Sequence, residues 1–89
     1  MKSVTTERFR KAYERLPAAM KRKAREAFLV WQEEPHSTSL RFKCVHSAKP
    51  IYSVRVAFGW RALGIMNGEE MVWFWIGPHA EYDNILKRT

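Results

Sequence analysis

The segment MVWFWI, residues 71–76, is apolar at every position, and it constrains the fold more than any other feature of the chain. Side chains of a strand alternate between its two faces. One face would carry Val72, Phe74 and Ile76, and the other Met71, Trp73 and Trp75. A strand that is apolar on both faces must be covered on both. The chain has 89 residues, so we expect residues 1–89 to form one domain with this strand inside it.

Two helices are predicted before the sheet. Phe9, Tyr13 and Leu16 recur at helical spacing, and Thr5 and Thr6 are suitable N-caps. Pro17 ends this helix and can open the next at its first position. The apolar side of the second helix consists of Met20, Ala24, Ala27, Phe28 and Trp31, and Pro35 ends it. A helical hairpin of roughly 30 residues therefore covers one face of the sheet.

After Pro35 the apolar residues alternate with a period of two, which predicts strands. The first strand lies within LRFKCVH, residues 40–46, and the next is IYSVRVAF, residues 51–58. In the latter, Tyr52, Val54, Val56 and Phe58 share one face, and Ser53, Arg55 and Ala57 share the other. A turn at Gly59 leads to WRALGIM, and Asn67-Gly68 then predicts a tight hairpin into the apolar strand.

A short helix over residues 81–87 closes the chain, with Tyr82, Ile85 and Leu86 on its apolar side. Lys2 to Val4 has only a weak strand pattern. The predicted class is α+β: an N-terminal helical hairpin packed on a mainly antiparallel four-stranded sheet, with a short C-terminal helix. The closing helix covers part of the second face, so we expect a shallow groove there, walled by tryptophan and floored by Arg55.

Positive charge is concentrated in the middle of the chain. The formal net charge is +7, yet residues 35–68 hold no acid and five basic residues, namely Arg41, Lys43, Lys49, Arg55 and Arg61. Uncompensated positive charge favours a polyanionic partner, nucleic acid first and an acidic protein or membrane surface second. The single cysteine, Cys44, excludes an internal disulfide, and the three histidines lack metal-ligand spacing. We expect a cytoplasmic protein without a membrane span, metal or cofactor.

Arginine, aromatic residues and one histidine after the apolar strand suit RNA cleavage without a metal. Arginine can stabilise the phosphorane, histidine can transfer protons near neutral pH, and aromatic rings can stack with unpaired bases. Each residue also has a structural explanation. Arg55 either extends to solvent or lines a site. His79 either begins a helix, where Asp83 could pair with it, or presents a catalytic group.

Three segments resemble the RelE/ParE superfamily of small bacterial toxins from toxin–antitoxin pairs. They are LPAAMKRKAREAFLVWQEEPHSTSLRFK, YSVRVAFGWRALG and VWFWIGPHAEYD, and the resemblance extends over about residues 5–86. It implies a helical hairpin on one face of a sheet, an RNA-binding groove on the other, and a cognate antitoxin as partner. In the ribonuclease branch it implies cleavage of mRNA on the ribosome without a metal.

The resemblance also implies roles for individual residues. Arg61 stands where that branch stabilises the scissile phosphate, Arg55 at a basic groove position, and His79 at a general-acid position. Tyr82 lies near an aromatic residue that packs on the substrate, and Arg41 or Lys43 would contact the RNA backbone. Ser53 occupies a position that is often basic. That departure keeps open the ParE-like branch, which acts on DNA gyrase, and a weakly toxic homologue that mainly binds its antitoxin.

Overall fold

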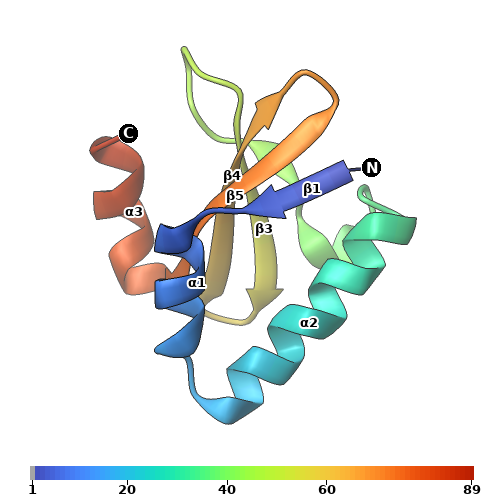
Figure 1. The fold of residues 1–89 in the computed structure, drawn as a ribbon, viewed down its shortest axis with the longest axis vertical. Helices are drawn as coiled ribbons and strands as arrows, with labels where there is room; N and C mark the ends of the chain where they lie inside the picture. The colour runs from blue at the N-terminus through green and yellow to red at the C-terminus, as the bar shows by residue number, and fades with distance from the viewer. Residues whose placement is uncertain (1) are drawn as a thin grey trace.

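Five strands form a single sheet in the order β1-β5-β4-β3-β2 in the computed structural model, which describes residues 2–89 (Figure 1). The strands are β1 (Lys2–Thr5), β2 (Lys43–Cys44), β3 (Ile51–Ala57), β4 (Trp60–Asn67) and β5 (Glu70–Pro78). The helices are α1 (Glu7–Glu14), α2 (Ala18–Glu33) and α3 (His79–Lys87), with a 3₁₀ turn η1 at Thr38–Leu40. No helix among residues 2–89 combines the length and apolar character that crossing a membrane requires.

The predicted α+β class is confirmed, but the sheet has one strand more than the four predicted. Strand β1 pairs in parallel with β5, from Lys2 opposite Glu70 to Thr5 opposite Trp73. The other neighbouring strands are antiparallel. The apolar pattern of residues 2–5 is weak because their contribution is mainly the backbone hydrogen bonds of an edge strand, which periodicity does not reveal.

Local signals predicted that these three helices exist, and the boundaries of two of them differ slightly from the prediction. The Thr6 hydroxyl accepts a hydrogen bond from the Phe9 backbone N–H at 3.1 Å, so Thr6 is the N-cap of α1. Pro17 itself is the N-cap of α2, in an extended conformation, and not the first helical residue as predicted. Helix α3 begins two residues earlier than predicted, at His79.

The two faces of the sheet carry separate cores. Helices α1 and α2 cover one face, where Leu16, Ala24, Ala27 and Trp31 pack against Val54, Ala62, Trp73 and Ile76. Helix α3 covers part of the opposite face, where Tyr82 packs with Ile51, Leu63 and Trp75. The strand β5 lies between β1 and β4 and contributes to both cores, as its two apolar faces predict.

A β-bulge divides β5 and makes one prediction wrong. Leu63 is opposite Trp75 and Gly64 is opposite Trp73, so Phe74 has no partner on β4. The extra residue reverses the alternation. Trp73 therefore packs under the helical hairpin and Trp75 under α3, although strict alternation predicted that both share a face.

Gly64 provides the space that this arrangement needs. A Cβ atom at this position would lie 2.6 Å from Met71 Sδ and 2.7 Å from Trp73 Cε3, closer than atoms of a packed core approach. Only glycine allows the Met71 and Trp73 side chains to lie across β4.

A second bulge lies between β3 and β4. Arg55 is opposite Arg61, and Ala57 is opposite Trp60, so Val56 has no partner. Phe58 was predicted to share a face of the strand with Val54. Instead its ring lies beside Arg55, with 5.9 Å between Arg55 Cζ and the ring centroid, and the residue is 88% exposed. Strand β3 ends at Ala57, so Phe58 lies in the turn to β4 and not in the strand as predicted, and the bulge interrupts the alternation just before it.

The strand predicted within residues 40–46 is much shorter in the structure. Residues 38–40 form η1, and Arg41 follows in the left-handed region with a φ of 48°. Only Lys43 and Cys44 pair with β3, opposite Ser53 and Tyr52. Strand β2 is therefore a short edge strand.

Candidate functional site

The residues predicted to line a basic groove lie on the face of the sheet that α3 partly covers, and we refer to this basic surface as the basic groove. Ser53 and Arg55 of β3 and Arg61 of β4 project to this face, because Ser53 is opposite Leu63 and Arg55 is opposite Arg61. Tyr82 and His79 reach it from α3. The regular part of the β3–β4 pairing and the position of α3 thus bring five of the predicted site residues to one face of the sheet.

Arg61 is held by two contacts. Its Nη1 donates a long hydrogen bond of 3.4 Å to the hydroxyl of Ser53, which is fully buried. Its Cζ atom lies 5.7 Å from the centroid of the Tyr82 ring, within the range of a cation–π contact. Arg61 is half-buried, and no carboxylate forms an ion pair with it among residues 2–89. Its positive charge is therefore positioned but not neutralised.

His79 is exposed at the start of α3. Its ring stacks on Tyr82, with 5.3 Å between the centroids and 16° between the planes. Its backbone N–H donates to the carbonyl oxygen of Gly59 at 2.7 Å, which joins the start of α3 to the β3–β4 turn. Within the described chain, His79 forms no ion pair with Asp83. The imidazole is oriented by an aromatic ring and is open to solvent.

Two arginines lie directly opposite each other across β3 and β4. Arg55 and Arg61 are cross-strand partners, and like charges in this position destabilise a sheet. No acidic residue occurs in residues 35–68 to compensate them. An anion placed between the two guanidinium groups would relieve the repulsion, which is the arrangement that a phosphate site requires.

Aromatic rings lie beside the two arginines, but they are not the predicted tryptophans. Trp73 and Trp75 are only 4% and 6% exposed, because each is packed into one of the two cores. The rings beside the arginines are Tyr82 and Phe58. Sequence reasoning missed Phe58, because the bulge that exposes its ring leaves no mark in the alternation of IYSVRVAF.

Lys43 and Arg41 differ in their placement. Lys43 is the register partner of Ser53, so its exposed side chain lies on the same face as the arginines. Arg41 is exposed two residues earlier, in the left-handed turn after η1, outside the strand register. Residues 2–89 contain no group of three or more histidine, cysteine or acidic side chains arranged to bind a metal ion.

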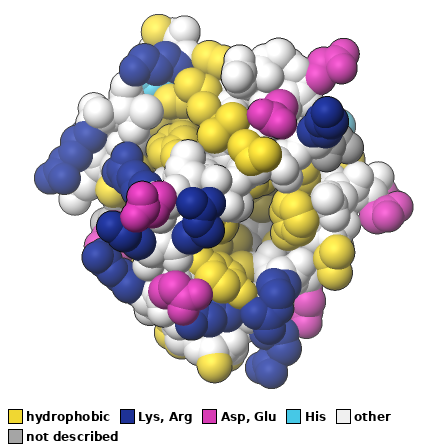
Figure 2. All heavy atoms as spheres, in the orientation of Figure 1, with side chains coloured by type: hydrophobic (Ala, Val, Ile, Leu, Met, Phe, Trp, Pro, Cys, Tyr) yellow, Lys and Arg dark blue, Asp and Glu magenta, His cyan; other side chains and the backbone are white. Residues whose placement is uncertain are grey.

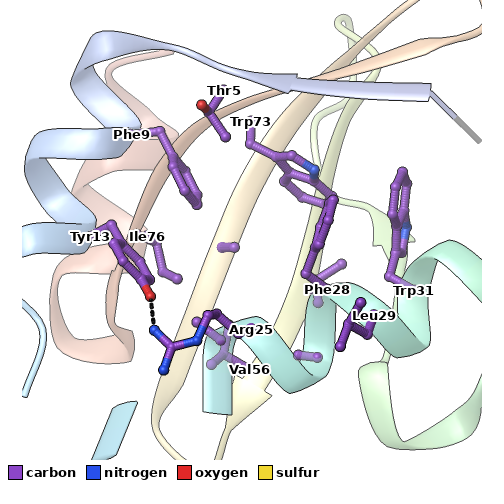
Figure 3. A pocket seen from close by; sticks show the side chains of 14 residues that line it. Thr5, Phe9, Tyr13, Arg25, Phe28, Leu29, Trp31, Val56, Trp73 and Ile76 are labelled. Atoms are coloured by element: carbon purple, nitrogen blue, oxygen red, sulfur yellow. Dashed lines mark hydrogen bonds between the residues drawn. The ribbon is translucent and has the colours of Figure 1, made fainter. Parts of the chain in front are cut away.

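The opposite face carries a second candidate surface, an apolar groove between α1 and α2 (Figure 3). Its volume is about 350 Å³, and its lining includes Phe9, Tyr13, Phe28, Leu29, Trp31 and Trp73. In Figure 2, hydrophobic side chains surround a hollow near the middle of this face, with Lys and Arg side chains at its edge. We refer to it as the hairpin groove.

Polar groups in the hairpin groove are few. Arg25 donates from Nη1 to the Tyr13 hydroxyl at 2.7 Å across its open end (Figure 3). The indole N–H groups of Trp31 and Trp73 are buried without a hydrogen-bond partner in residues 2–89. Sequence reasoning missed this groove. The sequence signal for the groove was the run of apolar residues from Phe28 to Val30. Three successive residues of a helix cannot all lie on its buried side, so some of these side chains must be exposed.

The fold defines a class of structures, which solved chains of toxins and of toxin–antitoxin complexes share. Solved structures with the same fold include RelE of the RelB–RelE antitoxin–toxin complex from Methanococcus jannaschii, with a TM-score of 0.75 and 12% identity over 92% of this chain and 96% of that chain. A YoeB/ParE toxin from Agrobacterium tumefaciens has a TM-score of 0.71 and 19% identity over 89% of this chain and 99% of that chain. A chain of the RelBE2 toxin–antitoxin complex from Mycobacterium tuberculosis has a TM-score of 0.69 and 20% identity over 86% of this chain and 95% of that chain.

The sequence itself identifies the family within this class. The chain belongs to the ParE-like toxin domain family, whose model matches residues 18–84. Among curated protein sequences, none matches the chain. The predicted membership of the RelE/ParE superfamily is thus confirmed by a sequence match to the family and by the shared fold.

Proposed function

We propose that this protein is the toxin of a type II toxin–antitoxin pair and that it cleaves mRNA on the ribosome in the cytoplasm. The observation that carries the proposal is the arrangement around Tyr82. A fixed guanidinium, that of Arg61, and an open imidazole, that of His79, contact the same ring. RNA cleavage needs these two groups close together, one for the phosphate and one for the leaving oxygen.

In this proposal the ribose 2′-hydroxyl gives its proton to water and its oxygen attacks the adjacent phosphorus. A 2′,3′-cyclic phosphate forms and the bond to the 5′-oxygen breaks. Arg61 and Arg55 donate hydrogen bonds to the non-bridging oxygens, where negative charge develops in the transition state. His79 gives a proton to the departing 5′-oxygen. Ser53 orients Arg61, Tyr82 orients both Arg61 and His79, and Lys43 and Arg41 contact the RNA backbone. These side chains supply the chemistry without a metal or cofactor.

The partner in this proposal is an antitoxin that occupies the hairpin groove. The groove is apolar and its edge is basic. An amphipathic segment with acidic residues would match these properties. The solved complexes of RelB with RelE contain a protein of the same fold bound to its antitoxin.

Inducible expression followed by mapping of RNA 5′ ends in cells tests the proposed activity. We expect new ends within translated regions for the wild type and none for a His79→Ala/Arg61→Ala double variant. A matched control is Arg25→Ala, which removes an arginine from the opposite face. Growth arrest with intact mRNA would contradict the proposal, and so would full cleavage by the double variant.

Ser53 supports a second candidate, inhibition of DNA gyrase. It is buried and neutral at a position that is often basic in the ribonuclease branch. A DNA supercoiling assay with purified gyrase separates the two functions. Inhibition at micromolar protein together with intact mRNA would favour gyrase as the target. If induction leaves both growth and mRNA unaffected, the third reading, a weakly toxic antitoxin-binding homologue, is favoured.

A further inference from the structure

We infer that the ring of Phe58 is a platform on which an unpaired base of bound RNA stacks, so that Phe58 contributes to substrate affinity and base preference. This inference rests on the proposed function as a ribonuclease. Phe58 is 88% exposed, whereas the other exposed large hydrophobic residues range from 38% to 61%. A phenylalanine with almost its whole side chain in water does not contribute to the core.

The backbone places this ring beside the basic groove. The bulge at Val56 interrupts the alternation of β3, and Gly59, with a φ of 80°, closes the turn to β4. Bulges commonly redirect a side chain next to an active site. Phe58 follows Ala57, the last residue of β3, and therefore lies in this turn and not within the sheet.

The surroundings of Phe58 suit a nucleotide. Arg55 Cζ lies 5.9 Å from its ring centroid, and Arg61 is the cross-strand partner of Arg55. A base stacked on the open ring would therefore have its phosphate near two guanidinium groups. Stacking on an aromatic ring accepts any base and depends on a flat π surface, which an aliphatic side chain lacks.

The turn that carries Phe58 is also joined to the catalytic candidate. The carbonyl of Gly59 accepts a hydrogen bond from the backbone N–H of His79 at 2.7 Å. The Phe58 ring and the His79 imidazole are thus attached to two backbone segments that a hydrogen bond joins. A base held on Phe58 would fix the position of the adjoining phosphate relative to His79 and Arg61, which is the function of a substrate-positioning contact.

The positive charge favours RNA over a protein partner for this ring. A single exposed apolar residue is ordinary on a protein surface. Phe58, however, lies in the part of the chain, residues 35–68, that has five basic residues and no acid. A protein partner that buried the ring would also have to desolvate Arg55, which is costly without a carboxylate in place.

The test compares Phe58→Leu and Phe58→Trp with the wild type in single-turnover cleavage on ribosomes programmed with different A-site codons. Leucine keeps the apolar volume but removes the π surface, and tryptophan keeps that surface. We expect Phe58→Leu to cleave about 5- to 150-fold less efficiently at limiting protein, the range for loss of one base stack, and Phe58→Trp to remain close to the wild type. Val4→Ala, which removes an exposed apolar side chain from β1, should have no effect. Wild-type cleavage by Phe58→Leu at every codon would overturn the inference.

A second measurement separates this inference from the proposed function. A short single-stranded RNA with 2-aminopurine loses fluorescence when that base stacks on an aromatic ring. If the wild-type protein quenches the probe and Phe58→Leu does not, the platform is supported even when no ribosomal cleavage occurs, and only the proposed activity fails. If both proteins quench equally, or neither does, the platform is overturned. Thermal unfolding should show that Phe58→Leu is folded, which we expect because the side chain at this position is exposed.

Discussion

The guanidinium of Arg61 lies over the ring of Tyr82, with 5.7 Å between its Cζ atom and the ring centroid. The same ring stacks with the imidazole of His79 at 5.3 Å. Tyr82 is only 8% exposed, because it packs with Leu63 and Trp75 in the core beneath α3. A buried ring therefore determines where two surface groups lie, and the packing of α3 is coupled to the geometry of the site.

Replacing Tyr82 tests this coupling. Tyr82→Phe keeps the ring and should cleave RNA close to the wild-type rate. Tyr82→Leu removes both ring contacts and should lower the single-turnover rate roughly 5-fold, since a cation–π contact typically contributes about 1 kcal/mol. Circular dichroism during thermal unfolding must show that both variants fold cooperatively. A folded Tyr82→Leu protein that cleaves at the wild-type rate would show that the ring has no positioning role.

Lys43 gives a prediction about salt dependence. Its exposed side chain lies opposite Ser53 on the basic face, so it should contact a phosphate. The dependence of log affinity on log salt for a single-stranded RNA should become shallower by about 0.7 in Lys43→Ala, the value for loss of one phosphate contact. Lys23→Ala, an exposed lysine of α2, should leave the slope unchanged. Equal slopes for all three proteins would remove Lys43 from the RNA interface.

Leu29 gives a prediction about the antitoxin. It is 61% exposed and lines the hairpin groove, so Leu29→Asp places a charge where an apolar segment should bind. We expect titration calorimetry with the protein encoded by the adjacent open reading frame to show affinity at least about 10-fold lower, from lost apolar burial. RNA cleavage by the free toxin should not change, because Leu29 lies on the other face. Gln32→Asp, also exposed on α2, serves as the matched control.

Gly64 gives a prediction about stability. Gly64→Ala should lower the free energy of unfolding by about 1–3 kcal/mol in urea denaturation, the usual range for overpacking a core. The added Cβ would overlap with Met71 Sδ and Trp73 Cε3. The near-ultraviolet dichroism of tryptophan should change as well. Gly68→Ala is the comparison, because a Cβ there meets nothing within 4 Å and only the positive φ of 65° opposes it. An unchanged tryptophan signal in Gly64→Ala would contradict the close packing.

The sequence predicted those parts of the fold that local patterns determine. The cap at Thr6, the break at Pro17 and the hairpin at Gly68 each depend on residues within a few positions. Strand β1 was only a weak possibility, because its pairing with β5 joins residues about seventy positions apart and requires little apolar pattern. The bulges at Val56 and Phe74 were missed, since periodicity assumes that alternation continues.

The candidate site was predictable where alternation holds. Ser53, Arg55 and Arg61 share a face because they lie before the bulge on β3 and after it on β4. Tyr82 and His79 are three residues apart on one helix, so their proximity follows from helical spacing. Phe58 and the hairpin groove were not predictable. The first depends on a bulge, and the second on the distance between two helices, which no local pattern specifies.

The hairpin groove and the basic groove lie on opposite faces of one sheet, in a molecule whose shortest extent is 24 Å. A partner seated only between α1 and α2 would leave Arg55, Arg61 and His79 open to RNA. To block them directly, its chain would have to continue around an edge of the sheet, which takes about seven extended residues at roughly 3.3 Å each. The reach of a partner beyond its docking segment, and not its affinity alone, would then decide whether the toxin is silenced.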